Sequence, residues 1–564
     1  MRNWWALLTA LVGAIVLAIV ATTPPGPAGN DAPSTAFSAT RAMADVRVIG
    51  RAPHPTGSAE DAVVRAHLIA RLQAMGLEVA TATGAMDADG AKRLAGWSKS
   101  TVTPPLTNIV AILPGRDRAA PAVLLMAHHD SVWGSPGAAD DGAGVASILE
   151  TVRAIRASGQ VPQRDLMILL TDGEELGLEG AKSFFANDPR RGHVGVIVNL
   201  ETRGGGGRAS MFETGSDNGA MMDLFAGAVG RPVGTSLSVF IYKKLPNSTD
   251  YTVAKKLGVP GFNFAFIGRP ELYHSPLATP ERLDQGALQD MGRQVLDLTR
   301  GLLAAPALPG KAADRVFFDA FGLFFVSYAP AIGWLILLLG AGGYAVAAWR
   351  RSTVAEVAKG AGVLLALIVA AGLALYLVNL ASGAGGKTNY YDRLAAIPRL
   401  EVQALLVCLA LLVTLRRWLP SKAGTIAGAA VPLLALGAFA QIAAPTAAYP
   451  FAVPLMLGGL ALALDRLAGR SAGAAAAIFA AVLGVGYMLG FGFFLLQAVG
   501  PGMPMIAAVP LAIATVLLLP LMPAIEPRRA TQASGILIAL AIGIALWVLL
   551  DPMAASVAAY STDH

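Results

Sequence analysis

Three polar motifs decide the fold of this chain: Met126-Ala127-His128-His129-Asp130-Ser131, then Ala139-Asp140-Asp141-Gly142-Ala143-Gly144, then Thr171-Asp172-Gly173-Glu174-Glu175-Leu176-Gly177. Each motif follows, or lies one short loop beyond, an apolar run that we expect to form a strand, at residues 122–127 and 166–171. Parallel strands end at the same edge of a sheet, where α/β proteins hold their functional groups. We therefore expect the three motifs to meet at one edge of a sheet.

The segments around these motifs predict an α/β domain with a largely parallel sheet and helices on both faces. We expect helices at residues 59–76, 142–157 and 178–187, and strands at residues 108–113, 122–127, 166–171 and 194–200. Residues 83–105 show no clear period, and an inserted loop or flap is expected there.

The composition indicates a membrane protein with two unlike halves. The 564 residues are 55% hydrophobic with a mean hydropathy of +0.57, which is too apolar for a soluble protein. Six of the seven histidines precede Lys311, and eight apolar runs follow it: 326–349, 361–380, 402–415, 424–443, 451–464, 472–497, 503–521 and 534–550. An all-α, multi-span membrane domain is therefore expected after the α/β domain.

The order of these segments predicts four regions. Residues 1–22 contain an apolar run long enough to cross a bilayer, which we interpret as an uncleaved anchor, with a cleaved signal peptide as the alternative. Residues 23–50 begin with a stretch rich in Pro, Gly and Ala and are expected to be a linker and lead-in. Residues 51–310 would form the α/β domain, and residues 311–564 the membrane domain with about eight spans.

The charges between the apolar runs set the expected orientation. With the N-terminus inside, the inside loops carry ten Lys and Arg residues, whereas the outside loops carry only Lys387, Arg393 and Arg399. This asymmetry marks the cytoplasmic side, so we expect nine spans, a cytoplasmic N-terminus and a periplasmic or equivalent location for the α/β domain. The basic loops also explain the pI near 9.4. Nucleic-acid binding is not indicated, because the sequence has no basic run with interleaved aromatic residues. The single cysteine, Cys408, excludes an intrachain disulfide.

The α/β domain contains the side chains that a hydrolytic di-metal site needs. Such a site takes imidazole and carboxylate ligands from several strand ends, one carboxylate that bridges both ions, and a free carboxylate that accepts a proton from water. His128 and Asp130 would point the same way on an extended strand. Glu174 and Glu175 are adjacent and cannot easily do the same job, so one can bind metal while the other serves as a base.

Five separated motifs occur in the order and approximate spacing of a known family: His128-x-Asp130, Asp140-Asp141-x-x-Gly144, Glu174-Glu175-x-Gly177, Asn199-Leu200-Glu201 and Tyr273-His274-Ser275-Pro276. Over residues 51–302 the chain resembles the co-catalytic di-zinc aminopeptidases and glutamate carboxypeptidases. Its eight apolar runs after this region, and residues 53–58 and 279–283, resemble the membrane branch with endoplasmic reticulum metallopeptidase and vacuolar membrane protease. The resemblance implies a zinc-exopeptidase-like, mostly parallel sheet flanked by helices.

The resemblance also implies two zinc ions per chain and a role for each motif residue. The implied ligands are His128, Asp140, Glu175, Glu201 and His274. Asp140 would bridge the ions, with His128 and Glu201 on one and Glu175 and His274 on the other. Glu174 would be the general base, and Asp130 would accept a hydrogen bond from the His128 ring. The peptide after Asp140 is cis in the family, and Glu201 stands where many members have Asp.

The function expected from this resemblance is a membrane-bound zinc metallopeptidase that hydrolyses peptides as an aminopeptidase, with the lipid bilayer as its other partner. Two alternatives remain open. A glutaminyl-cyclase-like acyltransferase would use one zinc, and the second histidine and glutamate set speaks against it. A transporter or receptor with a ligand-binding, peptidase-like domain would need no base, and the intact Glu174 speaks against that reading.

Each motif taken singly also has a structural explanation. An Asp-Asp-Gly sequence is often only a turn, and adjacent glutamates are favoured at a helix N-terminus. We prefer the functional interpretation because five motifs coincide in family order. The remaining histidines of this region are interpreted as structural: His54, His67, His129 and His193. Tyr251 is left between two interpretations, a donor to a developing oxyanion and a buried core residue.

Overall fold

The computed structural model describes residues 2–386 and 390–551, so Lys387, one of the three outside-loop charges, lies outside the described residues. The chain forms two compact units. One runs from Thr23 to Ser327, and the other combines the N-terminal residues up to Thr22 with the described chain from Tyr328 to Asp551.

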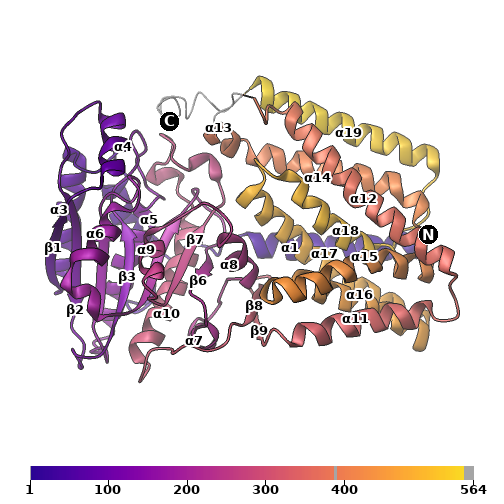
Figure 1. The fold of residues 1–564 in the computed structure, drawn as a ribbon, viewed down its shortest axis with the longest axis horizontal. Helices are drawn as coiled ribbons and strands as arrows, with labels where there is room; N and C mark the ends of the chain where they lie inside the picture. Colours follow the sequence, from indigo (N-terminus) through magenta and orange to yellow (C-terminus); the bar gives the residue numbers. More distant parts are fainter. Residues whose placement is uncertain (1, 387–389, 552–564) are drawn as a thin grey trace. The chain divides into compact units, whose positions relative to one another are not determined.

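The Thr23–Ser327 unit is built on a seven-stranded sheet with the strand order β1-β2-β4-β3-β5-β7-β6 (Figure 1). The strands are β1 (Glu78–Gly84), β2 (Leu106–Leu113), β3 (Ala122–His128), β4 (Leu166–Thr171), β5 (Val194–Thr202), β6 (Ser210–Thr214) and β7 (Gly261–Phe266). The pairings among β4, β3, β5 and β7 are parallel, and those of β1 with β2, β2 with β4 and β6 with β7 are antiparallel. The predicted α/β class with a mostly parallel sheet is confirmed.

The central strands are buried on both faces, because their side chains alternate between two apolar clusters. In β3, Leu125 and Ala127 belong to the cluster that includes residues of α2 (Ala39–Ile49), α3 (Ala59–Ala74), α5 (Gly142–Ala157) and α10 (Gln285–Ala304). Leu124 and Met126 belong to the opposite cluster, with α6 (Glu179–Asn187) and α9 (Asp250–Lys256). Strands buried on both faces have continuous apolar sequences, so their polar side chains are left to the strand ends.

The elements next to the polar motifs agree with the sequence. The predicted helix at 142–157 and strand at 166–171 coincide with α5 and β4. The side chain of Asp141 caps α5 by accepting a hydrogen bond from the backbone N–H of Gly144 at 3.0 Å. This cap fixes the chain just after Asp140.

The segment 83–105 differs from the expected loop, because it contains the helix α4 (Ala88–Ser98). The carboxylate of Asp87 caps this helix by accepting hydrogen bonds from the backbone N–H groups of Asp89 and Gly90. Leu94 and Trp97 are buried and lie three residues apart on one helix face. Two apolar positions are too few to give a recognisable period in the sequence.

The expected linker and lead-in at 23–50 also differs, because its second half is the core helix α2. Ala42, Met43 and Val46 are at most 1% exposed and belong to the main apolar cluster. The compact unit therefore begins before residue 51.

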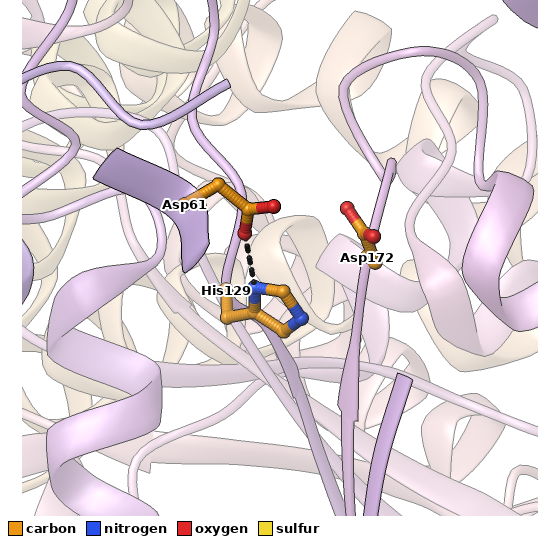
Figure 2. Close-up of side chains that lie close together, drawn as sticks. All are labelled: Asp61, His129 and Asp172. Atoms are coloured by element: carbon orange, nitrogen blue, oxygen red, sulfur yellow. Dashed lines mark ion pairs between the residues drawn. The ribbon is translucent and has the colours of Figure 1, made fainter. Parts of the chain in front are cut away.

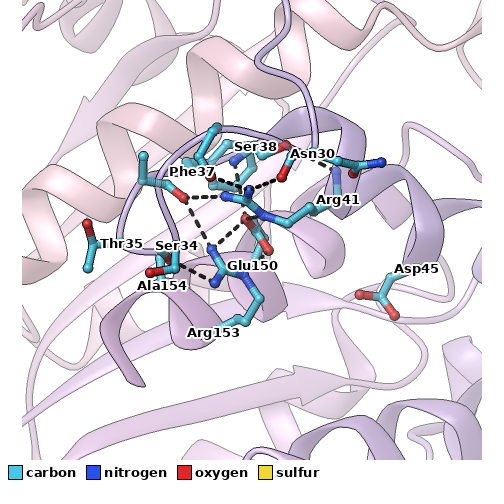
Figure 3. A network of polar contacts seen from close by, with 12 residues as sticks. Asn30, Ser34, Thr35, Phe37, Ser38, Arg41, Asp45, Glu150, Arg153 and Ala154 are labelled. Atoms are coloured by element: carbon cyan, nitrogen blue, oxygen red, sulfur yellow. Dashed lines mark hydrogen bonds and ion pairs between the residues drawn. The ribbon is translucent and has the colours of Figure 1, made fainter. Parts of the chain in front are cut away.

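Charged side chains hold the segment that precedes α2 (Figure 3). The Arg41 guanidinium donates hydrogen bonds to Glu150 Oε1 at 2.8 Å and to the carbonyl oxygens of Ala32 and Ala36 at 2.9 and 2.7 Å. Arg153 donates to Glu150 Oε2 at 2.6 Å. Charge-assisted bonds of this kind satisfy the carbonyl groups of a segment that forms no helix or strand.

The boundary after the sheet lies later than residue 310. A two-stranded hairpin, β8 (Val316–Ala320) and β9 (Phe324–Tyr328), follows α10, and Phe317 of β8 is fully buried in the main cluster. The apolar run 326–349 therefore starts in a strand, and its helix, α11 (Ile332–Ala348), begins at Ile332.

The second unit is all-α. Its long helices are α1 (Arg2–Thr22), α11, α12 (Val354–Ala381), α14 (Ile397–Leu415), α15 (Ala423–Ala443), α16 (Tyr449–Leu467), α17 (Arg470–Val499), α18 (Ala508–Leu518) and α19 (Pro527–Leu550). Within residues 2–386 and 390–551, seven helices are long and apolar enough to cross a membrane, and the apolar helices at Ile332–Ala348 and Pro504–Leu518 are shorter. Each predicted apolar run thus contains a helix, and the chain is an integral membrane protein.

The N-terminal helix α1 packs along α17. Gly486 of α17 faces Ala14, and a Cβ atom at Gly486 would lie 3.1 Å from the carbonyl oxygen of Ala14. Small residues that let two backbones approach are typical of helix packing in membranes. The first apolar run is therefore part of the helical unit.

Candidate metal centre

The two carboxylate oxygens of Asp140 face two different histidines. Oδ1 lies 3.1 Å from Nε2 of His128, and Oδ2 lies 3.2 Å from Nε2 of His274. A carboxylate that offers one oxygen to each of two imidazole rings has the arrangement of a bridging ligand.

Each of these histidines also faces a glutamate. Nε2 of His274 lies 3.0 Å from Oε1 of Glu175, and Nε2 of His128 lies 3.8 Å from Oε1 of Glu201. His128, Asp140 and Glu175 each offer a ligand atom within 4.8 Å of the other two. The structure thus brings all five predicted ligand residues together, with Glu201 the least closely placed.

The ends of three parallel strands position this centre. His128 is the last residue of β3, Glu174 and Glu175 follow β4, and Glu201 is the second-last residue of β5. His274 comes from a loop and has a left-handed backbone with φ of +52°. The Asp140–Asp141 peptide is cis, as the resemblance implies. The prediction that the motifs meet at one sheet edge is confirmed.

Asp130 was expected to accept a hydrogen bond from the His128 ring through its carboxylate. In the structure its carboxylate accepts from two backbone N–H groups, and its backbone carbonyl lies beside the ring. Its carboxylate accepts hydrogen bonds from the backbone N–H groups of Glu174 at 3.0 Å and Glu175 at 3.3 Å. The nearest acceptor for Nδ1 of His128 is the backbone carbonyl of Asp130 at 2.9 Å, whereas the carboxylate lies 3.5 Å away. The strand alternation does not extend to Asp130 because β3 ends at His128. A carbonyl beside Nδ1 requires a proton there and leaves Nε2 free to bind a metal.

Negative charge is crowded in this centre. Burial first, and then the charge of Glu201, raises the pKa of Glu174 well above its usual range. Burial likewise raises the pKa of Glu175, and that of Glu201 to about 8. Burial also acts to raise the pKa of Asp140, but the two histidines outweigh it and hold that pKa below its usual range. The carboxylates outnumber the two histidines in this centre, and a bound cation would relieve that excess of negative charge.

Two contributions to the centre have no signal in the sequence. Arg93, on α4, donates a hydrogen bond to the backbone carbonyl of Glu175 at 3.2 Å. Tyr242, at the end of α8 (Ser236–Tyr242), has its pKa raised by burial, then by the charge of Glu213, and less by the charges of Glu201 and Glu174. Neither residue belongs to a motif, and only the fold places them here.

Tyr251 is a core residue. Its side chain is fully buried in the second apolar cluster, and its hydroxyl donates to the carbonyl of Val259 at 3.3 Å. The neighbouring Asp250 carboxylate accepts a hydrogen bond from the hydroxyl of Thr171. Of the two interpretations of Tyr251, the structure supports burial in the core.

The histidines interpreted as structural have other partners. His67 pairs with Asp45 at 2.9 Å, and His193 lies 3.5 Å from Asp165. His129, adjacent to the metal centre in sequence, belongs to a separate group with Asp61 and Asp172 (Figure 2).

All seven predicted site residues lie within residues 108–299, which match the family model described as Peptidase family M28. The chain contains a peptidase M28 domain. The matched range begins in β2 and ends in α10, so the M28 domain includes every strand end that supplies the metal centre.

The curated relatives are named as a metallopeptidase and a membrane protease. The chain is 28% identical over 329 residues to human Endoplasmic reticulum metallopeptidase 1, covering 55% of this chain and 36% of that protein. It is 31% identical over 332 residues to Vacuolar membrane protease of Pyrenophora tritici-repentis, covering 52% of this chain and 34% of that protein. The chain therefore spans about a third of the length of these relatives.

About half of the chain is also similar to solved structures. Aminopeptidase from Aneurinibacillus sp. strain AM-1 has 16% sequence identity and a TM-score of 0.38, covering 50% of this chain and 96% of that chain. Porphyromonas gingivalis glutaminyl cyclase has 20% identity and a TM-score of 0.37, covering 47% of this chain and 98% of that chain.

Proposed function

We propose that the chain is a membrane-bound zinc metallopeptidase that holds two zinc ions in the centre around Asp140 and acts as an aminopeptidase. The observation that carries the proposal is the carboxylate of Asp140, whose two oxygens each face a histidine with a glutamate beside it. The M28 domain and the names of the curated relatives support peptide hydrolysis.

The donor atoms of the centre suit zinc. Imidazole nitrogens and carboxylate oxygens are the ligands that zinc takes in catalytic sites. His128 and Glu201 would hold one ion, Glu175 and His274 the other, and Asp140 both. Bound zinc supplies a Lewis acid that polarises the scissile carbonyl and makes the attacking water more acidic.

Glu174 is the residue that moves the proton in this proposal. It adjoins the ligand Glu175, and Asp130 holds the backbone N–H groups of both glutamates. Glu174 accepts a proton from the attacking water and delivers it to the leaving amine. Asp130 is a positioning residue, because it fixes the glutamates through its carboxylate and the His128 ring through its carbonyl.

The test compares metal content with hydrolysis in the full-length protein purified in detergent. Zinc would be counted by mass spectrometry in the wild type and in Asp140→Asn, and a panel of aminoacyl fluorogenic substrates would be assayed with each. The proposal expects Asp140→Asn to lose two zinc ions and all chelator-sensitive release of the N-terminal residue. Loss of one zinc together with pyroglutamate formation from glutaminyl peptides would indicate a cyclase instead. Bound zinc with no turnover of any peptide would indicate a ligand-binding domain.

We also propose that the M28 domain lies outside the cytoplasm, with a cytoplasmic N-terminus and nine spans. The basic residues between the apolar helices support this orientation. Cysteine labelling tests it, because the only native cysteine, Cys408, is buried. A membrane-impermeant maleimide should label Gln160→Cys in intact spheroplasts, and Arg351→Cys only after lysis. Both positions are exposed, so the reverse pattern would invert the topology.

A further inference from the structure

A second group of ligand-type side chains surrounds His129. Asp61 of α3, His129 just after β3 and Asp172 just after β4 lie close together (Figure 2). Each offers a potential ligand atom within 4.8 Å of the other two. All three are almost fully buried, with 0%, 1% and 0% of their surfaces exposed. Burying two carboxylates and an imidazole is costly unless their polar atoms find partners.

Each of the three side chains uses one polar atom in a contact with the surrounding protein and turns another toward the centre of the group. Oδ2 of Asp61 accepts a hydrogen bond from Arg65 at 2.7 Å, and Oδ2 of Asp172 accepts one from the backbone N–H of Thr107 at 2.7 Å. Nε2 of His129 lies 3.2 Å from the carbonyl oxygen of Thr107. Among the residues that the structure describes, the other atoms, Asp61 Oδ1, His129 Nδ1 and Asp172 Oδ1, are buried and have no hydrogen-bond partner. Asp61 Oδ1 and His129 Nδ1 lie at ion-pair distance from each other (Figure 2).

The carbonyl of Thr107 determines where His129 carries its proton. A carbonyl oxygen only accepts hydrogen bonds, so Nε2 must be protonated and a neutral ring has its lone pair on Nδ1. This nitrogen lies 3.2 Å from Oδ1 of Asp61 and forms an ion pair with it when the ring is protonated, so a metal ion would take the place of that proton. The same arrangement, with one ring nitrogen donating to a carbonyl and the other carrying a lone pair, is that of metal-binding histidines.

We propose that Asp61, His129 and Asp172 bind a divalent transition-metal ion, separate from the centre around Asp140. Atoms bound to one zinc ion at about 2 Å lie roughly 3–4 Å from one another, as the Asp61 and His129 atoms do. One imidazole and two carboxylates suit zinc or manganese. In residues 2–386 and 390–551, Asp172 has no ion pair, so a cation also supplies its missing counter-charge.

The ion has a structural role, because its ligands are buried away from substrate. It would join α3 to the segments that follow β3 and β4, which also carry Asp130, Glu174 and Glu175. A cation at this position therefore fixes the two loops that carry the candidate metal centre, without taking part in its chemistry.

The test counts metal ions in two backgrounds, so that it does not depend on the proposed function. The full-length protein is purified in detergent with chelator-washed buffers, and zinc and manganese are counted by mass spectrometry. His129→Gln should hold one ion fewer than the wild type, and Asp140→Asn with His129→Gln should hold one fewer than Asp140→Asn alone. Equal metal contents within either pair would overturn the proposal, whatever Asp140→Asn does to zinc or hydrolysis.

Control variants separate metal loss from misfolding. His67→Gln alters another histidine that pairs with a carboxylate, and its metal content should equal that of the wild type. Asp172→Asn keeps the side-chain shape and should lose the same single ion as His129→Gln. If both site variants fail to fold, anomalous scattering from wild-type crystals at the zinc and manganese edges decides. A peak among the three side chains supports the site, and no peak there overturns it.

Discussion

The adjacent residues His128 and His129 belong to two different clusters of histidine and carboxylate side chains, and the two clusters differ in exposure. In the group of His128, the side chains of Asp140 and Glu175 are 9% and 8% exposed, and that of His274 is 10% exposed. In the group of His129, the three residues are at most 1% exposed. The first group is therefore partly open to solvent, whereas the second is closed within the protein.

The difference follows from the geometry of a strand end. Consecutive residues of an extended chain project to opposite sides. At the end of β3 this directs His128 toward the loop of Asp140 and His129 toward the first turn of α3, where Asp61 lies. In the two proposals, the same kinds of side chain serve substrate chemistry on one side and stability on the other.

Removal of metal by a chelator should give the largest difference between the two groups. An accessible centre exchanges its ions with solvent, whereas a buried ion leaves only when the protein opens. We expect 1,10-phenanthroline to abolish hydrolysis while one ion per chain remains bound, and added zinc to restore activity. Metal counts and activity measured over the same time course check this. Loss of all bound ions in one step would show that the two groups do not differ in their access to solvent.

Replacing Glu174 tests whether the accessible group is catalytic. Glu174→Gln keeps the side-chain size but cannot accept a proton, so kcat should fall about 10²–10⁴-fold, the usual contribution of a general base. Zinc content should stay at the wild-type value. Turnover within a few-fold of the wild type would exclude Glu174 as the base.

The two histidines give a matched pair of variants. His128→Gln removes a proposed ligand and should lower kcat/KM by more than about 100-fold, the upper effect of an outer-shell partner. His129→Gln should keep kcat/KM within a few-fold but lower the melting temperature. Assays of the two variants in one preparation series check this contrast. Equal losses of activity would mean that both histidines serve the same centre.

A third pair of histidine and carboxylate side chains, His67 with Asp45, should show the smallest effect when it is broken. Its effect on stability is a reference for the other two groups. Burial acts to raise the pKa of Asp45, but its bonds to His67 and Arg71 outweigh this and lower it below 3.8. Asp45 therefore stabilises the fold above about that pH, and the contribution is lost as the pH falls through the lowered pKa. Asp45→Asn should cost about 1–3 kcal/mol at neutral pH. The melting temperatures of variant and wild type should converge below pH 3.8, and a constant difference would contradict the assignment.

Much of the fold was predictable because the central elements have strong local signals. The limits of α5 and β4 coincide with the predicted segments, since β4 is a continuous apolar run and α5 starts at a capping aspartate. Helices α2 and α4 were not predicted, for two different reasons. Pro- and Gly-rich residues precede α2 and suggested a linker, although Arg41 and Glu150 hold that segment in place. In α4 only Leu94 and Trp97 are buried apolar side chains.

The sequence by itself determined which residues form the candidate metal centre and which segments form apolar helices. Both depend on local properties: polar motifs after apolar strands, and apolar runs long enough to form spans. Only the tertiary structure decided that Asp140 lies between His128 and His274, that the Asp130 carbonyl orients the His128 ring, and that Asp61 and Asp172 meet at His129. These contacts join residues far apart in the chain, so they depend on how strands pair and helices pack.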